Sequence, residues 1–379
     1  MTFQSLIAAR RRAIDHWCTR EAHTQSAAAR HRRATMDAHA STPLEHVALR
    51  PKDHALLGRG GFRRVGDLVG VDVQTAATSM RVNPEKAQAL LEEVAEGAKP
   101  PPWHSARELE AREHQRVPVV SFCRGIDELL EGGAKPGKVL EVCGGPGAGK
   151  TQLLLQLCVD ATIPHQFCGA GGASVFIDAD GSFAPSRCSQ LAKEVAKHVH
   201  RLARKKPEHR EAAASYSEDA CLDAIHVFRA LDHGGVVRAL AQASTIQDLK
   251  LLVVDSVAAH LRTFEGDPGE RIRIIAKLAL DLSRVARSGV AVVVSNQLAS
   301  NLTSDRPGPA LGEAWSHACD ERLMLQRDAS GKRSATLAKS SCRAVGAAPF
   351  VVDERGVRDA SRKRRGTGSS GTAASANAE

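Results

Sequence analysis

The feature that most constrains this chain is a glycine-rich loop between two apolar segments. Residues 139–143 have the apolar character of a buried strand, and residues 152–159 have that of a helix. The loop between them comprises Gly144, Gly145, Pro146, Gly147, Ala148, Gly149, Lys150 and Thr151. This spacing fits the pattern G-x-x-x-x-G-K-[ST], in which backbone N–H groups and a helix N-terminus surround a phosphate chain. It predicts a nucleotide-binding P-loop, with an ordinary glycine-rich turn as the alternative.

Three side chains are candidates for the chemistry at this loop. Lys150 is expected to reach the β and γ oxygens of ATP, and Thr151 to hold Mg²⁺. Asp255 ends an apolar run with the form of a Walker B strand, whose carboxylate holds the magnesium shell. An Asp at a strand end also serves ordinary turns, so this role depends on the preceding P-loop. ATP and Mg²⁺ are the expected cofactors.

After the loop, short apolar runs alternate with longer segments that can supply helices. Four runs have the composition of strands buried on both faces: residues 174–178, 225–228, 251–255 and 291–295. Three later runs are separated by turn residues and are expected to be antiparallel strands: residues 322–325, 334–338 and 350–353. The predicted fold class is α/β, with a mainly parallel sheet and C-terminal antiparallel strands.

Two further strand ends carry polar side chains. Asp178 and Asp180 follow the strand after the P-loop helix, at the sheet edge where parallel sheets place ligand groups. One of these carboxylates could orient an attacking water. Asn296 and Gln297 end another strand at the same edge, where an amide can hydrogen-bond a γ-phosphate. The alternative for each residue is a polar side chain that only satisfies nearby backbone groups.

The composition divides the chain into five segments. Residues 1–45 are basic and are expected to be a disordered arm, and residues 46–98 have apolar positions at helical spacings, which predict a small helical domain. A run of three prolines opens the expected linker, residues 99–117. The ATPase core is expected to span residues 118–357, beginning from a strand near 117–122. Residues 358–379 form a basic tail that cannot bury a core.

Charge and cysteine usage narrow the class of protein. The formal net charge of +9 favours a polyanionic partner such as nucleic acid. Nine cysteines include no C-x-x-C pair, so neither a zinc site nor a disulfide framework is expected. No apolar run has the length of a membrane span. The basic arm could be an organelle transit peptide or sequence upstream of a start at Met36.

The order of these motifs resembles the RecA-type recombinase family, in particular the eukaryotic strand-exchange recombinase and its paralogues, and most nearly the paralogues designated C. The resemblance runs from about residue 47 to residue 365. It is carried by residues 149–153, 160–164, 175–183 and 309–318. It implies a RecA-like ATPase core preceded by a helix-hairpin-helix-like domain. It also implies ATP and Mg²⁺ roles for Lys150 and Thr151, the Walker B role for Asp255 and a γ-phosphate sensor at Gln297.

The same resemblance implies contacts with DNA and with other subunits. Residues 298–309 match a DNA-facing loop, and His317 matches a histidine that lies toward the ATP of a neighbouring subunit. Trp103 and Ala106 fall where the family carries its Phe-x-x-Ala self-assembly motif, with local packing as the alternative. A basic element that acts as a nuclear localisation signal in the paralogues corresponds to Arg362, Lys363, Arg364 and Arg365. Its alternative is a solvated tail.

Four positions depart from the family pattern. Asp180 stands where the family has its catalytic Glu, and the shorter side chain predicts slow hydrolysis. Arg81 occupies the hairpin glycine position of the helical domain. Residues 340–349 lack the Pro-acid cap with which the recombinase covers ATP from the next subunit. Residues 298–309 contain one arginine, Arg306, and no aromatic residue for base stacking.

Three functional hypotheses follow. The first is a DNA-dependent ATPase that binds single-stranded or branched DNA within a nuclear complex of paralogues, with the recombinase as a further partner, during homologous recombination and double-strand break repair. The second is the strand-exchange recombinase itself, assembled in long homofilaments. The third is a non-hydrolysing assembly module whose nucleotide is structural, which the short Asp180 side chain favours.

Overall fold

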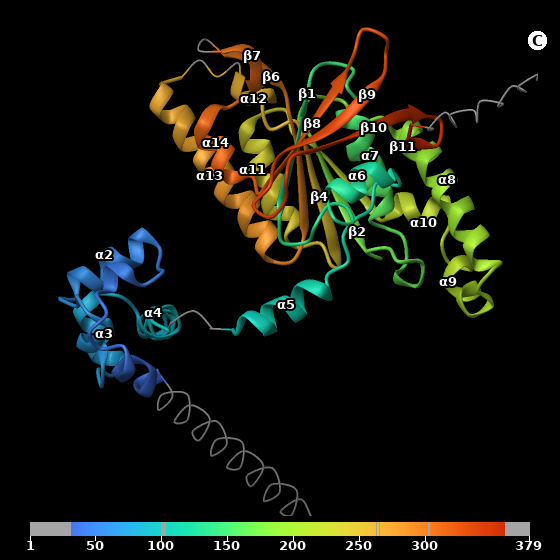
Figure 1. Ribbon diagram of the computed structural model, residues 1–379. Helices are drawn as coiled ribbons and strands as arrows, with labels where there is room; N and C mark the ends of the chain where they lie inside the picture. The colour runs from blue at the N-terminus through green and yellow to red at the C-terminus, as the bar shows by residue number, and fades with distance from the viewer. Residues whose placement is uncertain (1–31, 100–103, 263, 265, 302–303, 361–379) are drawn as a thin grey trace, which may run out of the picture. The chain divides into compact units, whose positions relative to one another are not determined.

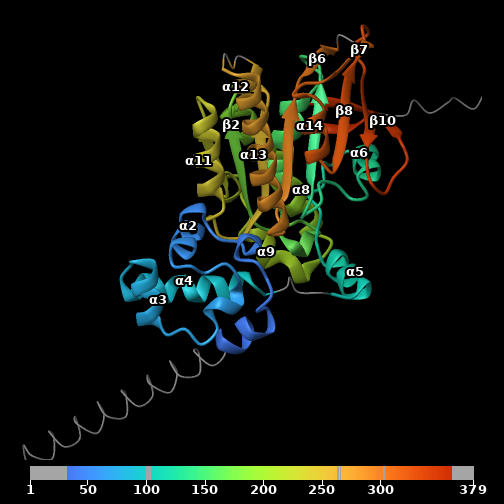
Figure 2. The same ribbon diagram turned by 90° about the vertical axis from the view of Figure 1, so that its left-hand side faces the viewer.

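The computed structural model describes residues 32–99, 104–262, 264, 266–301 and 304–360 (Figures 1 and 2). The chain divides into two compact units, Met1–Ala106 and Arg107–Glu379, which are described separately. Within the described ranges, no helix has both the length and the apolar character needed to cross a membrane.

The first unit is a small helical domain. Residues 32–38 are helical, and α2 (Pro51–Arg59), α3 (Val73–Met80) and α4 (Pro84–Gly97) follow, with 3₁₀ turns at Leu44–His46 and Val65–Leu68. Asp72 caps α3 by accepting the backbone N–H of Gln74 and of Thr75, both at 2.9 Å. Arg81 ends α3 in the left-handed region, with φ 55° and ψ 48°. The sharp connection to α4 therefore uses a residue with a side chain where glycine is the usual choice.

The core of this unit begins before residue 46. Met36 and Leu44 are 2% and 4% exposed and belong to the same buried cluster as Leu57 and Leu90. The sequence expectation of a basic arm over residues 1–45 therefore does not describe residues 36–45. Most of the Arg and His residues of the 1–45 segment lie before residue 36, so the composition of the whole segment did not indicate these two apolar core positions.

The second unit is built on one large sheet. Within its described residues, nine strands run in the order β11-β10-β9-β8-β1-β5-β4-β2-β3. Their bounds are β1 Val139–Gly144, β2 Ala173–Asp178, β3 Ile225–Arg229, β4 Leu249–Asp255, β5 Ala291–Asn296, β8 Glu321–Arg327, β9 Arg333–Lys339, β10 Gly346–Asp353 and β11 Gly356–Asp359. Strands β1 to β5 pair parallel with one another, and β8 pairs parallel with β1. Strands β8 to β11 pair antiparallel with one another. The predicted α/β fold class is confirmed.

Helices cover both faces of this sheet (Figures 1 and 2). One face carries α6 (Arg124–Leu129), α7 (Lys150–Asp160), α8 (Pro185–Ala203) and α10 (Glu218–Asp223); the short helix α9 (Arg210–Ala214) follows α8. The other face carries α11 (His233–Ala243), α13 (Pro268–Arg287) and α14 (Gly312–Ala318); the short helix α12 (Ala259–Arg262) follows β4.

The central strands are buried on both faces, as the continuous apolar runs predict. Leu251 and Val253 of β4 pack in the cluster on the α7 side, whereas Leu252 and Val254 pack in the cluster on the α13 side. This division follows from the alternation of side chains along a strand. The buried central strands hold their carboxyl ends at fixed positions.

Three segments differ from the sequence expectations. Residues 117–122 form no strand and make one isolated bridge, from Val119 to Ala134, because the opposite segment turns at Gly132 and Gly133, whose φ values of 112° and 120° lie outside the extended region. The expected linker contains a helix, α5 (Ala106–His114), which has no buried residue. Strand β11 extends the core to Asp359, whose Oδ1 accepts the backbone N–H of Gly125 at 2.9 Å.

Candidate nucleotide-binding site

The carboxyl ends of four parallel strands bring the predicted site residues to one edge of the sheet. In the β2–β4 pair, Asp178 lies opposite Asp255. In the β1–β5 pair, Cys143, which directly precedes the P-loop, lies opposite Asn296. The register of the sheet therefore places all these strand ends beside the loop that begins at Gly144.

The loop after β1 has the backbone that its glycines permit. Gly144 is the last residue of β1, and α7 begins at Lys150 with Gly149 as its N-cap. Gly147 and Gly149 have φ of 70° and 111°, values that side chains rarely tolerate. The free N–H groups at the start of α7 therefore face the loop, as binding of a phosphate chain requires.

Lys150 lies over the loop that precedes it. Its Nζ donates to the carbonyl oxygens of Gly144 at 2.8 Å and Gly145 at 3.2 Å. Burial lowers the pKa of Lys150, and the carboxylates of Asp255 and Asp180 oppose that shift. The ammonium group is thus held at the loop and within electrostatic reach of both candidate carboxylates.

Asp255 is the centre of a cluster of hydroxyl groups. The carboxylate is 2% exposed, and its Oδ2 accepts hydrogen bonds from Thr151 Oγ1 at 2.7 Å and Ser182 Oγ at 2.9 Å. Its Oδ1 accepts from the hydroxyl of Ser295. A hydroxyl and a carboxylate side by side are the oxygen ligands that Mg²⁺ prefers, so these residues fit the predicted ion.

The two carboxylates after β2 have different surroundings. Asp178 is buried and accepts the backbone N–H of Ser182 at 2.8 Å and of Phe183 at 3.3 Å, so it fixes the turn. Asp180 is exposed, and its backbone N–H donates to the carbonyl oxygen of Asp255 at 3.2 Å. Of the two, Asp180 has the carboxylate that can reach a bound molecule at this edge.

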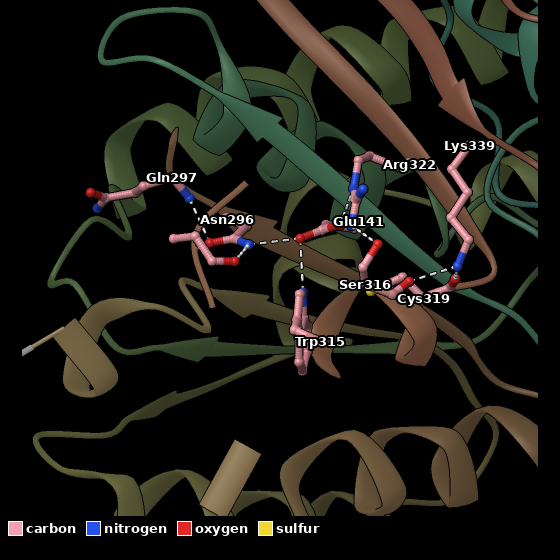
Figure 3. A network of polar contacts seen from close by, with 9 residues as sticks. Glu141, Asn296, Gln297, Trp315, Ser316, Cys319, Arg322 and Lys339 are labelled. Carbon is pink, nitrogen blue, oxygen red and sulfur yellow. Dashed lines mark hydrogen bonds and ion pairs between the residues drawn. The ribbon is translucent and has the colours of Figure 1, made fainter. Parts of the chain in front are cut away.

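Gln297 follows the end of β5 and is tied to its neighbour. Its backbone N–H donates to Asn296 Oδ1, and its carbonyl oxygen accepts the N–H of Ala310, both at 2.8 Å. These bonds close the base of a hairpin, β6 (Leu298–Asn301) and β7 (Ser304–Pro309), where the sequence predicted a DNA-facing loop. Figure 3 shows the Gln297 side chain pointing away from the buried groups around Asn296.

The candidate interface residues lie apart from this cluster in the chain. His317 is exposed on α14, and Ala106 is exposed at the first position of α5. Trp103 lies outside the described residues, as do Arg362, Lys363, Arg364 and Arg365. Their predicted roles stay predictions.

Sequence reasoning missed a basic group beside the P-loop. A cavity of about 500 Å³ borders Gly145 and Ala148 and is also lined by Arg327, Lys332 and Arg333 of the β8–β9 hairpin. Arg333 Nη2 lies 3.4 Å from the carbonyl oxygen of Gly147, and its buried Nε has no partner within the described residues. The only sequence signal is three basic residues around a turn, about 180 positions after the loop.

The chain is similar to known proteins over most of its length. A sequence profile of the Rad51 family matches residues 112–204 and 206–360. The chain is 32% identical over 340 residues to DNA repair protein RAD51 homolog 3 of Cricetulus griseus, which covers 84% of this chain and 92% of that protein. It is 32% identical over 250 residues to the protein of the same name in Dictyostelium discoideum, covering 64% of this chain and 65% of that one.

A third relative, DNA repair protein RAD51 homolog 4 of Bos taurus, is 30% identical over 277 residues, which cover 71% of this chain and 80% of that protein. The predicted resemblance to the recombinase paralogues is thereby confirmed. The chain belongs to the Rad51 family.

Proposed function

We propose that this protein is a DNA-dependent ATPase of the recombinase-paralogue type. It binds ATP with Mg²⁺ and single-stranded or branched DNA, and it acts in a nuclear complex of related paralogues during homologous recombination and double-strand break repair. The observation that carries the proposal is the 2.7 Å hydrogen bond between Thr151 and Asp255 at the end of the P-loop. The repair role is supported by the names of the relatives, and DNA binding by the net charge of +9.

The residues at the sheet edge divide the work of phosphoryl transfer. Lys150 stabilises negative charge on the β and γ oxygens, and Thr151 and Asp255 hold the magnesium shell. Mg²⁺, when bound, neutralises charge that develops on the transferred phosphoryl group. Asp180 orients a water for in-line attack. Because its side chain is one methylene shorter than Glu, the water is held less well and turnover is slow.

Steady-state ATPase activity, with and without single-stranded DNA, tests the proposal. We expect DNA to stimulate turnover, Lys150→Ala to remove it, and Asp180→Glu to increase it by about tenfold or more. Sedimentation with single-stranded DNA separates this protein from the recombinase itself, which would form ATP-dependent filaments. Turnover that Lys150→Ala leaves unchanged would contradict the proposal.

A nucleotide-gated assembly module is the second candidate, and the exposed, short carboxylate of Asp180 favours it. In that case ATP binds, but neither DNA nor Asp180→Glu gives turnover above the Lys150→Ala background. Assembly with paralogues would then be lost in Lys150→Ala and retained in Gln297→Ala. An ATPase that senses the γ-phosphate through Gln297 would instead respond to both changes.

A further inference from the structure

The P-loop strand contains a buried carboxylate that the proposed reaction does not use. Glu141 lies three residues before the loop, is 0% exposed, and points to the same face of the sheet as α14. Burying an ionised carboxylate is costly unless several donors satisfy it. Glu141 has three side-chain donors, each from a different element (Figure 3).

The first donor joins Glu141 to the end of β5. Asn296 Nδ2 lies 2.7 Å from Glu141 Oε1 and 2.8 Å from the carbonyl oxygen of Ala310. The Oδ1 of the same amide accepts the N–H of Gln297. One side chain therefore connects Glu141 to the proposed γ-phosphate sensor and to the base of the β6–β7 hairpin.

The other two donors join Glu141 to α14 and β8. Trp315 Nε1 donates to Oε1 at 2.8 Å, and Trp315 is 0% exposed. Arg322 Nε donates to Oε2 at 2.5 Å, while its Nη2 lies 3.2 Å from Ser316 Oγ. Two consecutive residues of α14 are thus held by this network, directly before His317.

We propose that Glu141 is a positioning residue that transmits the nucleotide state of the P-loop edge to the β6–β7 hairpin and to α14. The proposal rests on the proposed function, because it requires ATP at this edge. A change at Gln297 moves Asn296, which shares Oε1 of Glu141 with Trp315. The indole of Trp315 is therefore coupled to the end of β5 through one oxygen atom. Because Trp315 and His317 lie on the same helix, α14 moves with the indole.

The neighbouring strand β8 contains a second buried glutamate, Glu321, which serves as a control for a purely structural role of Glu141. Glu321 of β8 is 3% exposed and is bonded to Arg343, which also donates to the carbonyl oxygen of Leu129. In the described part of the chain, this carboxylate pairs with Arg343 and not with Asn296 or Trp315. Glu321→Gln therefore removes a buried charge of the same kind without touching the proposed coupling.

Hydrogen exchange of the full chain, with and without ATP and Mg²⁺, tests the inference in Glu141→Gln, Trp315→Phe and Glu321→Gln. We expect ATP to slow exchange in β6, β7 and α14 by about tenfold in the wild type and in Glu321→Gln. That effect should be lost in Trp315→Phe and reduced in Glu141→Gln, because one amide oxygen cannot accept from both Arg322 and the Asn296–Trp315 pair. The Kd of both variants for a fluorescent ATP analogue should stay within about threefold of wild type. Trp315→Phe decides the matter if Glu141→Gln does not fold.

The outcomes separate the inference from the function on which it rests. ATP-dependent protection that persists in both Glu141→Gln and Trp315→Phe would overturn the coupling alone. So would a wild type that binds ATP without any change in β6, β7 or α14. A wild type that binds no ATP would overturn the proposed function and the coupling with it.

Discussion

The hydroxyl of Thr151 donates to Oδ2 of Asp255 at 2.7 Å, although 104 positions separate the two residues in the sequence. The first residue lies at the start of α7 and the second at the end of β4. This hydrogen bond connects the P-loop to β4, the strand that ends in the candidate magnesium ligand Asp255.

We expect Asp255→Asn to raise the Mg²⁺ concentration needed for half-maximal ATP binding by about tenfold or more, equivalent to ~1.4 kcal/mol. The amide oxygen can still accept the Thr151 hydrogen bond, but the negative charge that attracts the cation is gone. Titration of a fluorescent ATP analogue at several Mg²⁺ concentrations measures this. Asp178→Asn is the control, because Asp178 accepts backbone N–H groups and should change thermal stability instead.

Arg333→Ala should weaken ATP binding by about tenfold, since a hydrogen bond to a charged group contributes roughly 1.5 kcal/mol or more. Its guanidinium lines the cavity beside the P-loop and has a buried Nε without a partner in the described structure. Isothermal titration calorimetry gives the affinity. In the matched variant Arg355→Ala, the lost side chain is 62% exposed and pairs with Asp353, so the affinity should not change. Equal affinities in both variants would exclude a nucleotide contact for Arg333.

The stability of the core should depend on pH through Asp127. Burial raises the pKa of this carboxyl to about 6, above the 3.8 of an exposed Asp, while Ser121 donates to it from its backbone N–H and its hydroxyl. The folded chain then keeps this proton when the unfolded chain has lost it. Its contribution to stability is complete below about pH 4 and is lost as the pH rises through about 6.

Asp127→Asn removes this titration and keeps an oxygen acceptor for Ser121. The melting temperature of the variant should therefore exceed that of the wild type at pH 7.5, with a smaller gain at pH 5. Asp328→Asn is the control, because the Ser330 hydroxyl lowers the pKa of Asp328 below 3.8 and this carboxyl is ionised at both pH values in the folded and the unfolded chain. Its effect on the melting temperature should therefore be the same at pH 5 and pH 7.5. A gain for Asp127→Asn that is the same at both pH values would refute the assignment.

Replacing Arg81 should stabilise the helical domain. A residue with a side chain in the left-handed region costs about 1–2 kcal/mol, and glycine relieves this cost at some expense in chain entropy. We expect Arg81→Gly to increase the free energy of opening of α3 and α4 by ~0.5–1 kcal/mol, measured by hydrogen exchange. Arg59→Gly, at the right-handed end of α2, should lower stability by ~0.5–1 kcal/mol. A destabilised Arg81→Gly would show that the Arg81 side chain makes a favourable contact.

The sheet and its nucleotide edge were predictable because both have local signals. Strands such as β4 and β5 are buried on both faces and therefore appear as unbroken apolar runs. The glycine positions of the P-loop are set by φ values that the loop itself requires. Once the parallel order of strands was inferred, Asp255 and Gln297 had to lie near that loop.

The remaining features depend on partners that are distant in the sequence. The role of Glu141, an acidic residue in an apolar strand, cannot be predicted from its sequence neighbours. Its hydrogen-bond donors are Asn296, Trp315 and Arg322, which lie 155, 174 and 181 positions away. The same holds for Arg333, 186 positions from Gly147. The strand predicted near residues 117–122 was wrong for another reason. The segment is apolar, but the chain opposite it turns at Gly132 and Gly133, which limits the pairing to a single bridge.

The donors around Glu141 also restrict how these residues can change in evolution. Removing Trp315 or Arg322 alone leaves part of a buried carboxylate unsatisfied, and removing Glu141 alone leaves a nearly buried guanidinium without its counter-charge. Such losses are not additive, because each depends on which partner remains. The three residues should therefore have been replaced together or kept together. Among descendants of the same ancestor, a lineage with an apolar residue at the Glu141 position should also lack the tryptophan and the arginine.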